Sequence, residues 1–193
     1  MGSTTPSTRE QVLQAAAQLF AQRGYRGTSV EDIGAACGIS GPAVYKHFTN
    51  KHAVLARLLT SISEHLLARG QEVVAAASTP EQALAELVAF HTDFALREPA
   101  LIRVQDRDLG SLEEREARTV RRLQRGYVEL WVAVLRELDP DLGVDAARTR
   151  AHATFGLLNS TPHSARVPAV ARAQLTAMAL RALDSGGRAA APA

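Results

Sequence analysis

Residues 28–48 read TSVEDIGAACGISGPAVYKHF, and this stretch decides the fold of the N-terminal part of the chain. Its pattern predicts two short helices separated by a turn. Thr28 is placed to cap the first helix while Glu31 reaches back to the helix start, and Ser40 is placed to cap the second. Gly38 supplies a turn residue that adopts positive φ without a Cβ penalty. The stretch therefore predicts a helix-turn-helix.

The apolar residues of this stretch indicate how its two helices pack. Ile33, Ile39 and Val44 are placed to bury against one another, and Gly34 leaves room for a close approach of the helices. In a helix-turn-helix the second helix, which begins after Ser40 here, is the one that enters a major groove. The same pattern therefore predicts a DNA-binding element.

The second helix carries the residues that we expect to meet DNA. Its first residues are small, so the backbone can come near the base edges, and the following residues carry donors that reach phosphates. These predicted contacts come from Ser40, Gly41, Pro42, Ala43, Tyr45, Lys46 and His47.

Outside this stretch, the spacing of apolar residues predicts helices throughout. Capping residues frame several of them: Ser7 or Thr8 with Glu10, Asn50, and Thr79 with Gln82. Because no sustained alternation of apolar and polar residues occurs, we predict an all-α fold of about nine helices. The other predicted helices cover residues 8–23, 50 to beyond 66, 79 to about 98, 100–108, 112–138 (the longest), 145–160 and 168–183, with a proline-containing break at 161–167.

Composition excludes several classes of protein. The chain has 193 residues, of which 46% are hydrophobic and 22% charged, so intrinsic disorder is excluded as the main state. No run of about 18 apolar residues occurs and the N-terminus is polar, which leads us to expect a cytoplasmic protein without membrane contact. Cys37 has no cysteine partner, and the six histidines form no metal-ligand motif. We therefore expect neither a disulfide nor a metal, and no cofactor.

The charge distribution points to an anionic partner. The net charge is +2, and the whole positive excess lies in residues 1–55, which hold five cations and three anions. Both lysines of the chain, Lys46 and Lys51, lie in this part. Such an asymmetry indicates an anionic partner for the N-terminal part of the chain.

The stretch TSVEDIGAACGISGPAVYKHFTNKHAVL at residues 28–55, preceded by LFAQRGYRG at 19–27, resembles the TetR family of bacterial transcriptional regulators. The resemblance implies an N-terminal three-helix module that binds DNA as half of a homodimer. It implies that Tyr45, His47 and Lys51 contact phosphates and that Gly41, Pro42 and Ala43 face bases. It also implies that Thr28, at the start of its helix, contacts the DNA backbone.

The sequence departs from the family pattern in two places. His52 stands where the family often has glutamate after the lysine, and neither Gly41 nor Ala43 has a side chain capable of bidentate base recognition. We therefore expect direct readout to be sparse and to depend on Lys46, on a thymine-methyl contact from Ala43 and on DNA shape.

For the rest of the chain, the resemblance implies a helical domain that encloses a small-molecule pocket. Its last two helices, here 145–160 and 168–183, would pair with those of a second subunit, and their alanine-rich faces permit close approach. The expected organisation is a DNA-binding domain at 1–52, an effector-binding and dimerisation domain at 53–185, and a flexible tail at 186–193.

Aromatic and polar residues of the C-terminal helices are candidates for the effector site. Aromatic residues at helical spacing are also typical of an ordinary core, an exposed arginine often pairs with a nearby acid such as Asp106, and a late asparagine can simply cap its helix. The candidates are Phe90, Phe94, Arg103, Gln105, Tyr127, Trp131, Phe155 and Asn159.

These observations predict a homodimeric repressor that binds a palindromic operator in double-stranded DNA and is released by a small-molecule effector. The effector would be an acyl-CoA, a fatty acid or an aromatic compound. A helical interaction module without sequence-specific DNA binding, and an activator, are the alternatives. An enzyme is not expected, because no acid, base, nucleophile or metal residues converge in a recognisable motif.

Overall fold

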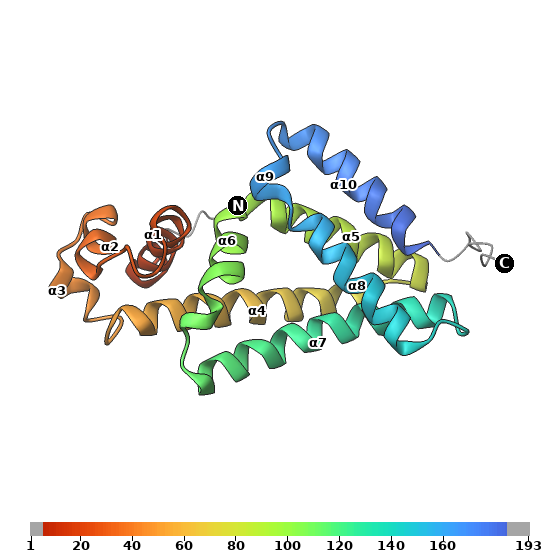
Figure 1. The fold of residues 1–193 in the computed structure, drawn as a ribbon, viewed down its shortest axis with the longest axis horizontal. Coiled ribbons are helices and arrows are strands. Elements are labelled where there is room, and N and C mark those ends of the chain that lie inside the picture. Colours follow the sequence, from red (N-terminus) through yellow and green to blue (C-terminus); the bar gives the residue numbers. More distant parts are fainter. Residues whose placement is uncertain (1–5, 185–193) are drawn as a thin grey trace. The chain divides into compact units, whose positions relative to one another are not determined.

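The computed structural model describes residues 6–184, which are mostly helical (Figure 1). No strand occurs among these described residues, which confirms the predicted all-α class. No helix within them is both long and apolar enough to cross a membrane. The flexible tail predicted at 186–193 lies outside the described residues. The helices are α1 (Thr8–Arg23), α2 (Val30–Ala36), α3 (Gly41–Val44), α4 (Lys51–Ala76), α5 (Pro80–Arg97), α6 (Pro99–Asp108), α7 (Glu114–Leu138), α8 (Val144–Leu158), α9 (Thr161–Ser164) and α10 (Pro168–Leu183), with a 3₁₀ turn, η1, at Leu109–Ser111.

The chain divides by packing into two compact units. The first comprises the residues up to Glu64 together with Ala100–Leu123, and the second comprises His65–Pro99 and the residues from Gln124 onward. Helices α4 and α7 each contribute residues to both units. The division by function into residues 1–52 and 53–185 stays a prediction.

Side-chain caps fix helix starts where the sequence places suitable residues. The Ser7 hydroxyl accepts the N–H of Glu10, and the Glu10 carboxylate accepts the N–H of Ser7, so the predicted capping box of α1 is confirmed. Thr79 accepts the N–H of Gln82 at the start of α5, also as predicted. Helix α1 ends at Gly24, where φ is +83°.

The start of α2 differs by one residue from the prediction. Ser29 is the N-cap: its hydroxyl accepts the N–H of Asp32 at 3.0 Å, and the Asp32 carboxylate accepts the N–H of Ser29 at 2.8 Å. Thr28 donates its hydroxyl to the carbonyl oxygen of Gly24 at 2.9 Å. The predicted cap at Thr28 with Glu31 is therefore wrong, because the turn that ends α1 already uses the Thr28 hydroxyl.

Helices α2 and α3 pack through a small apolar core. Ile33 and Val44 are buried, at 0% and 1% exposed, as predicted, whereas Ile39 in the turn is half-buried. Gly38 in the turn has a φ of +71°. A Cβ on Gly34 would lie 2.9 Å from the carbonyl oxygen of Ile39, so only glycine permits this approach of the two helices.

Two expectations about the longer helices need correction. Helix α4 has 26 residues and α7 has 25, so the prediction that α7 is the longest helix is wrong for the described residues. The predicted cap of α4 is confirmed, because Asn50 accepts the N–H of Ala53 at 2.7 Å. Helix α7 begins at Glu114 rather than near Leu112. The reason is that the Leu112 N–H closes the preceding 3₁₀ turn by donating to the carbonyl oxygen of Leu109.

In the second unit, α10 packs against α5 and α8 (Figure 1). The short helix α9 lies within residues 161–167, which the sequence predicted only as a break between two helices. Pro162 lies in the first turn of α9, where its missing N–H has no helical partner to lose, so the proline does not prevent this helix. The Thr161 hydroxyl holds α9 against α5 by donating to the carbonyl oxygen of Ala95 at 2.7 Å.

The two glycines of the helix-turn-helix should respond differently to substitution. Gly34→Ala should lower the free energy of unfolding by about 2 to 3 kcal/mol, because the new Cβ meets backbone that must shift. Gly38→Ala should lower it by about 1 kcal/mol through left-handed strain alone, since no atom lies within 4 Å of the added Cβ. Gly38→Asn should lower it less than Gly38→Ala does, because asparagine tolerates this region. Urea denaturation measures all three, and a Gly34→Ala protein as stable as Gly38→Asn would contradict the close approach.

Candidate nucleic-acid interface

The predicted DNA-contacting residues of the second helix lie together on α3 and the turn that follows it. Tyr45 is 50% exposed, Lys46 and His47 are exposed beside it, and Val44 is the residue of this segment that faces the core. Gly41 and Ala43 are half-buried. We call this set the α3 surface; it comprises Ser40, Gly41, Pro42, Ala43, Tyr45, Lys46 and His47.

The backbone of the α3 surface is regular even though the helix is short. The α-helical part ends at Val44, and the chain continues as a hydrogen-bonded turn in which His47 donates its N–H to the carbonyl oxygen of Val44 at 2.9 Å. Ser40 occupies the N-cap position as predicted, but its hydroxyl makes no capping hydrogen bond. The exposed Ser40 side chain is therefore not used by the helix start.

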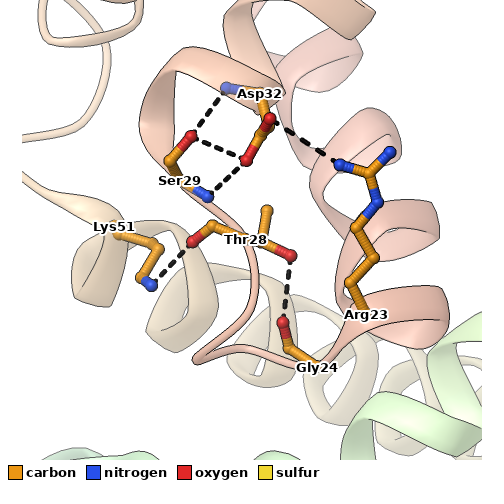
Figure 2. Close-up of polar contacts among 6 residues, drawn as sticks. All are labelled: Arg23, Gly24, Thr28, Ser29, Asp32 and Lys51. Carbon is orange, nitrogen blue, oxygen red and sulfur yellow. Dashed lines mark hydrogen bonds and ion pairs between the residues drawn. The ribbon is translucent and has the colours of Figure 1, made fainter.

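Lys51 ties the loop before α2 to the first turn of α4. Its ammonium donates to the carbonyl oxygens of Tyr25 at 2.8 Å and Thr28 at 2.7 Å, the second of which Figure 2 shows. The same ammonium lies 4.5 Å from the centre of the Tyr25 ring, in a cation–π contact. An ammonium has three N–H donors, so these carbonyls leave one for a phosphate. The side chain predicted to bind phosphate therefore also holds the loop.

Thr28 acts in this structure as a loop residue. Its side chain is 2% exposed and its hydroxyl donates to Gly24 (Figure 2). The Thr28 carbonyl oxygen accepts from Lys51, and the DNA contact that the resemblance assigns to Thr28 stays a prediction.

Asp32 fixes the loop at the start of α2 (Figure 2). Its carboxylate accepts hydrogen bonds from both the hydroxyl and the N–H of Ser29, and these bonds lower the pKa of Asp32 below its ordinary value. Arg23 lies 3.7 Å away on α1, but both side chains are well exposed, so this ion pair contributes little. The cap rather than the ion pair orients α2.

A second candidate site surrounds His91 in the second unit. The His91 ring is buried, and its centre lies between 5.0 and 6.2 Å from the ring centres of Phe94, Tyr127, Trp131 and Phe155. These four residues were all predicted for the effector site, and the structure brings them together from α5, α7 and α8. We call these five residues, with Asn159, the His91 cluster.

The His91 ring is fixed by a hydrogen bond on each nitrogen. Its Nε2 lies 3.0 Å from Oδ1 of Asn159, and its Nδ1 lies 3.3 Å from the hydroxyl of Tyr127. An amide oxygen can only accept, so Nε2 carries the proton and Nδ1 accepts from Tyr127. Burial lowers the pKa of His91 to about 4 and raises the pKa of Tyr127. At neutral pH both groups are therefore uncharged.

Sequence reasoning missed His91 as a site residue, although one signal pointed to it. His91 continues the apolar stripe of Leu84, Leu87 and Val88, which are buried. A polar ring in such a stripe needs buried partners, and Tyr127 and Asn159 supply them. The Nε1–H of Trp131 is also buried in this cluster, where it interacts with Tyr127 and offsets part of the rise in the pKa of that hydroxyl.

Three predicted effector residues are not members of this cluster. Phe90 contacts the ring of His65 on α4, with ring centres 6.0 Å apart. Arg103 and Gln105 lie on α6, in the first compact unit. Of the eight predicted residues, the structure thus brings together Phe94, Tyr127, Trp131, Phe155 and Asn159.

Two family models match the chain. One, described as bacterial regulatory proteins of the tetR family, matches residues 12–58 and so includes the helix-turn-helix. The other, a tetracyclin repressor-like C-terminal domain, matches residues 77–163.

Known proteins agree with these matches. The chain is 31% identical over 155 residues to the HTH-type transcriptional repressor KstR2 of Mycolicibacterium smegmatis, covering 74% of this chain and 73% of that protein. Its fold matches a TetR-family regulator from Bordetella parapertussis with a TM-score of 0.85 at 24% identity, over 98% and 100% of the two chains. It also matches FadR of Bacillus subtilis, solved in complex with stearoyl-CoA, with a TM-score of 0.75 at 21% identity, over 92% and 98%.

The chain therefore belongs to the TetR family of bacterial regulatory proteins. It is a transcriptional repressor of that family and not an enzyme.

Substitution of Lys51 should destabilise the fold, whereas substitution of Lys46 should not. Lys51→Ala should lower the free energy of unfolding by about 1 to 3 kcal/mol, because the carbonyl oxygens of Tyr25 and Thr28 lose their donor. Lys46→Ala is the matched control: this side chain is exposed, so the change should stay within about 0.5 kcal/mol. Chemical denaturation of both variants gives the comparison, and equal stabilities would show that Lys51 does not hold the loop.

His91 should make stability depend on pH. Between pH 6.5 and about 4, the unfolded chain takes up a proton at His91 that the folded protein does not accept, so stability falls as pH falls. The expected contribution over this window is about 3 kcal/mol. His91→Gln should flatten the pH dependence of the free energy of unfolding, whereas His152→Gln, at an exposed position, should not. Parallel pH profiles for wild type and His91→Gln would contradict the buried neutral ring.

Proposed function

We propose that this repressor acts as a homodimer on a palindromic operator in the bacterial cytoplasm, with one α3 surface of each protomer in a major groove. The observation that carries the proposal is the exposure of the α3 surface beside the buried Val44, on a helix held close to α2 by Gly34. A dimer with twofold symmetry reads an inverted repeat whose half-sites lie about one helical turn apart.

The residues of the α3 surface have different roles in this proposal. Tyr45 and His47 donate to phosphates, as does the remaining N–H of Lys51, and these contacts set the register on the duplex. Gly41, Pro42 and Ala43 let the backbone approach the base edges, where Ala43 contacts a thymine methyl group. Lys46 is the exposed cation of this surface and supplies the long donor for base or phosphate.

The dimer forms through α8 and α10. In residues 6–184, the large apolar side chains that are exposed are Tyr45 and four residues of the α8 and α10 region: Val144, Val167, Val170 and Met178. A shallow groove of about 450 Å³ lies along α10, where Val167, Val170 and Met178 contribute to its lining. An exposed apolar surface of this kind is typical of an interface with another chain.

The effector binds among the helices of the second unit and belongs to the acyl-CoA, fatty acid or aromatic compounds. The aromatic rings of the His91 cluster support this choice, as does the stearoyl-CoA bound to the similarly folded FadR. The effector releases DNA by binding more tightly to the conformation that does not fit the operator.

Selection from a random pool of double-stranded DNA tests operator binding. The wild-type protein should enrich an inverted repeat. Lys46→Ala should weaken binding to it and reduce the slope of log affinity against log salt by about one. Arg115→Ala, at an exposed position on α7, is the control and should leave the slope unchanged. If no sequence is enriched, the helical interaction module becomes the better account.

Sedimentation velocity tests the dimer. The wild-type protein should sediment at about twice the chain mass of 20.7 kDa. Val170→Glu should shift it toward monomer, because Val170 is 59% exposed in the single chain and a buried charge opposes association. Ala85→Glu adds the same charge at an exposed position on α5 and should leave the dimer intact. A Val170→Glu protein that dimerises as well as the Ala85→Glu control would exclude this face.

A further inference from the structure

An open cleft of about 300 Å³ lies between α4 and α5 in the second unit. Of its lining residues, the sequence predicted Phe90 and Phe94 for the effector site, whereas His65, Arg69, Arg97 and Glu98 were not predicted. One side of each helix lines the cleft. His65 and Arg69 are four residues apart on α4, and Phe90, Phe94 and Arg97 follow one another at spacings of four and three on α5, so each set lies on one side of its helix.

The two phenylalanines give the cleft aromatic walls. Both are half-buried, so part of each ring remains open to an occupant. Phe90 meets the His65 ring edge to face at 6.0 Å, and Phe94 lies 5.9 Å from the ring of His91. A ligand with an aromatic ring can stack against these walls with the geometry that aromatic pairs prefer. Through Phe94 it would also lie one side chain away from the His91 cluster.

Arg97 brings positive charge to the cleft that no carboxylate fully neutralises. Arg97 forms an ion pair with the carboxylate of Asp93, and Arg172 already donates to both oxygens of that carboxylate, at 2.6 and 3.2 Å. Arg97 reaches the same carboxylate only at 3.6 Å, so two guanidinium groups share one negative charge. The Arg97 Nε donates to the carbonyl oxygen of Asp93 at 3.2 Å, and three-quarters of the side chain is exposed, so the terminal N–H groups of the guanidinium can reach a ligand.

Arg69 and Glu98 are the other charged residues that line the cleft. Arg69 pairs with Glu72 one turn away on the exposed side of α4. Glu98 follows α5 as its C-cap residue, and no ion pair joins it to either arginine in the described part of the chain. A guanidinium binds a carboxylate through two parallel N–H donors, and two guanidinium groups beside aromatic walls suit a molecule with a carboxylate at one end and a ring at the other.

We propose that this cleft binds an aryl carboxylate, with the ring between Phe90 and Phe94 and the carboxylate on Arg97 and Arg69. The role of this molecule as the effector depends on the repressor function proposed above, whereas its binding does not.

Isothermal titration calorimetry on the full chain tests the site with 3-phenylpropionate as the probe. Its neutral counterpart, 3-phenylpropanamide, has the same ring and length and should bind about ten-fold more weakly, because it cannot make charge-assisted bonds. Arg97→Gln should weaken 3-phenylpropionate binding about ten-fold, and Arg69→Gln should also weaken it. Arg181→Gln removes the same charge from an exposed position on α10 and should leave the affinity within about two-fold. Melting curves establish that each variant is folded.

Three results would overturn the site: no binding of 3-phenylpropionate up to about 1 mM, equal binding of the acid and the amide, or an Arg97→Gln protein that matches Arg181→Gln. These results do not depend on DNA. A failed operator selection would remove the repressor function and leave the calorimetric result standing, and failed calorimetry would remove the cleft and leave the operator intact.

Discussion

The hydrogen bonds from Lys51 to the carbonyl oxygens of Tyr25 and Thr28 fix where the helix-turn-helix stands relative to α4. Between the end of α1 at Gly24 and the cap of α2 at Ser29, the chain has no helix to satisfy its carbonyl groups. A charged donor meets two of these carbonyls from the first turn of α4, and such bonds are stronger than neutral ones. The Lys51 bonds hold the loop that leads into α2, the Ser29–Asp32 cap sets the start of α2, and the Gly34 contact places α3 against it.

The N-terminal part could be predicted from sequence because its determinants are local. Capping residues, the Gly38 turn and the burial of Ile33 and Val44 all follow from neighbouring positions. The error at Thr28 has the same origin. Thr28 and Ser29 are both good caps, and only the folded turn shows that the Thr28 hydroxyl is taken by Gly24. Likewise, nothing in the sequence around Lys51 shows that it bonds residues more than twenty positions earlier.

The effector region could be predicted only in part, because its contacts join distant parts of the chain. The sequence identifies the aromatic residues, but it does not show which of their rings lie in contact. The packing of α5, α7 and α8 decides these contacts, and they decide whether a ring belongs to the core or to the candidate site. His91 unites the set because its two ring nitrogens need partners that lie 36 and 68 residues away. Phe90 shares the helix of Phe94 but contacts the ring of His65 on α4, whereas Phe94 contacts the ring of His91.

Two α3 surfaces that bind one operator together should leave a symmetric footprint, which hydroxyl-radical cleavage of the selected DNA measures. We expect two protected patches, related by the symmetry of the inverted repeat and separated by about one helical turn or slightly more. Lys46→Ala should weaken both patches equally. A single patch, or protection that does not follow the repeat, would show that the two surfaces do not bind together.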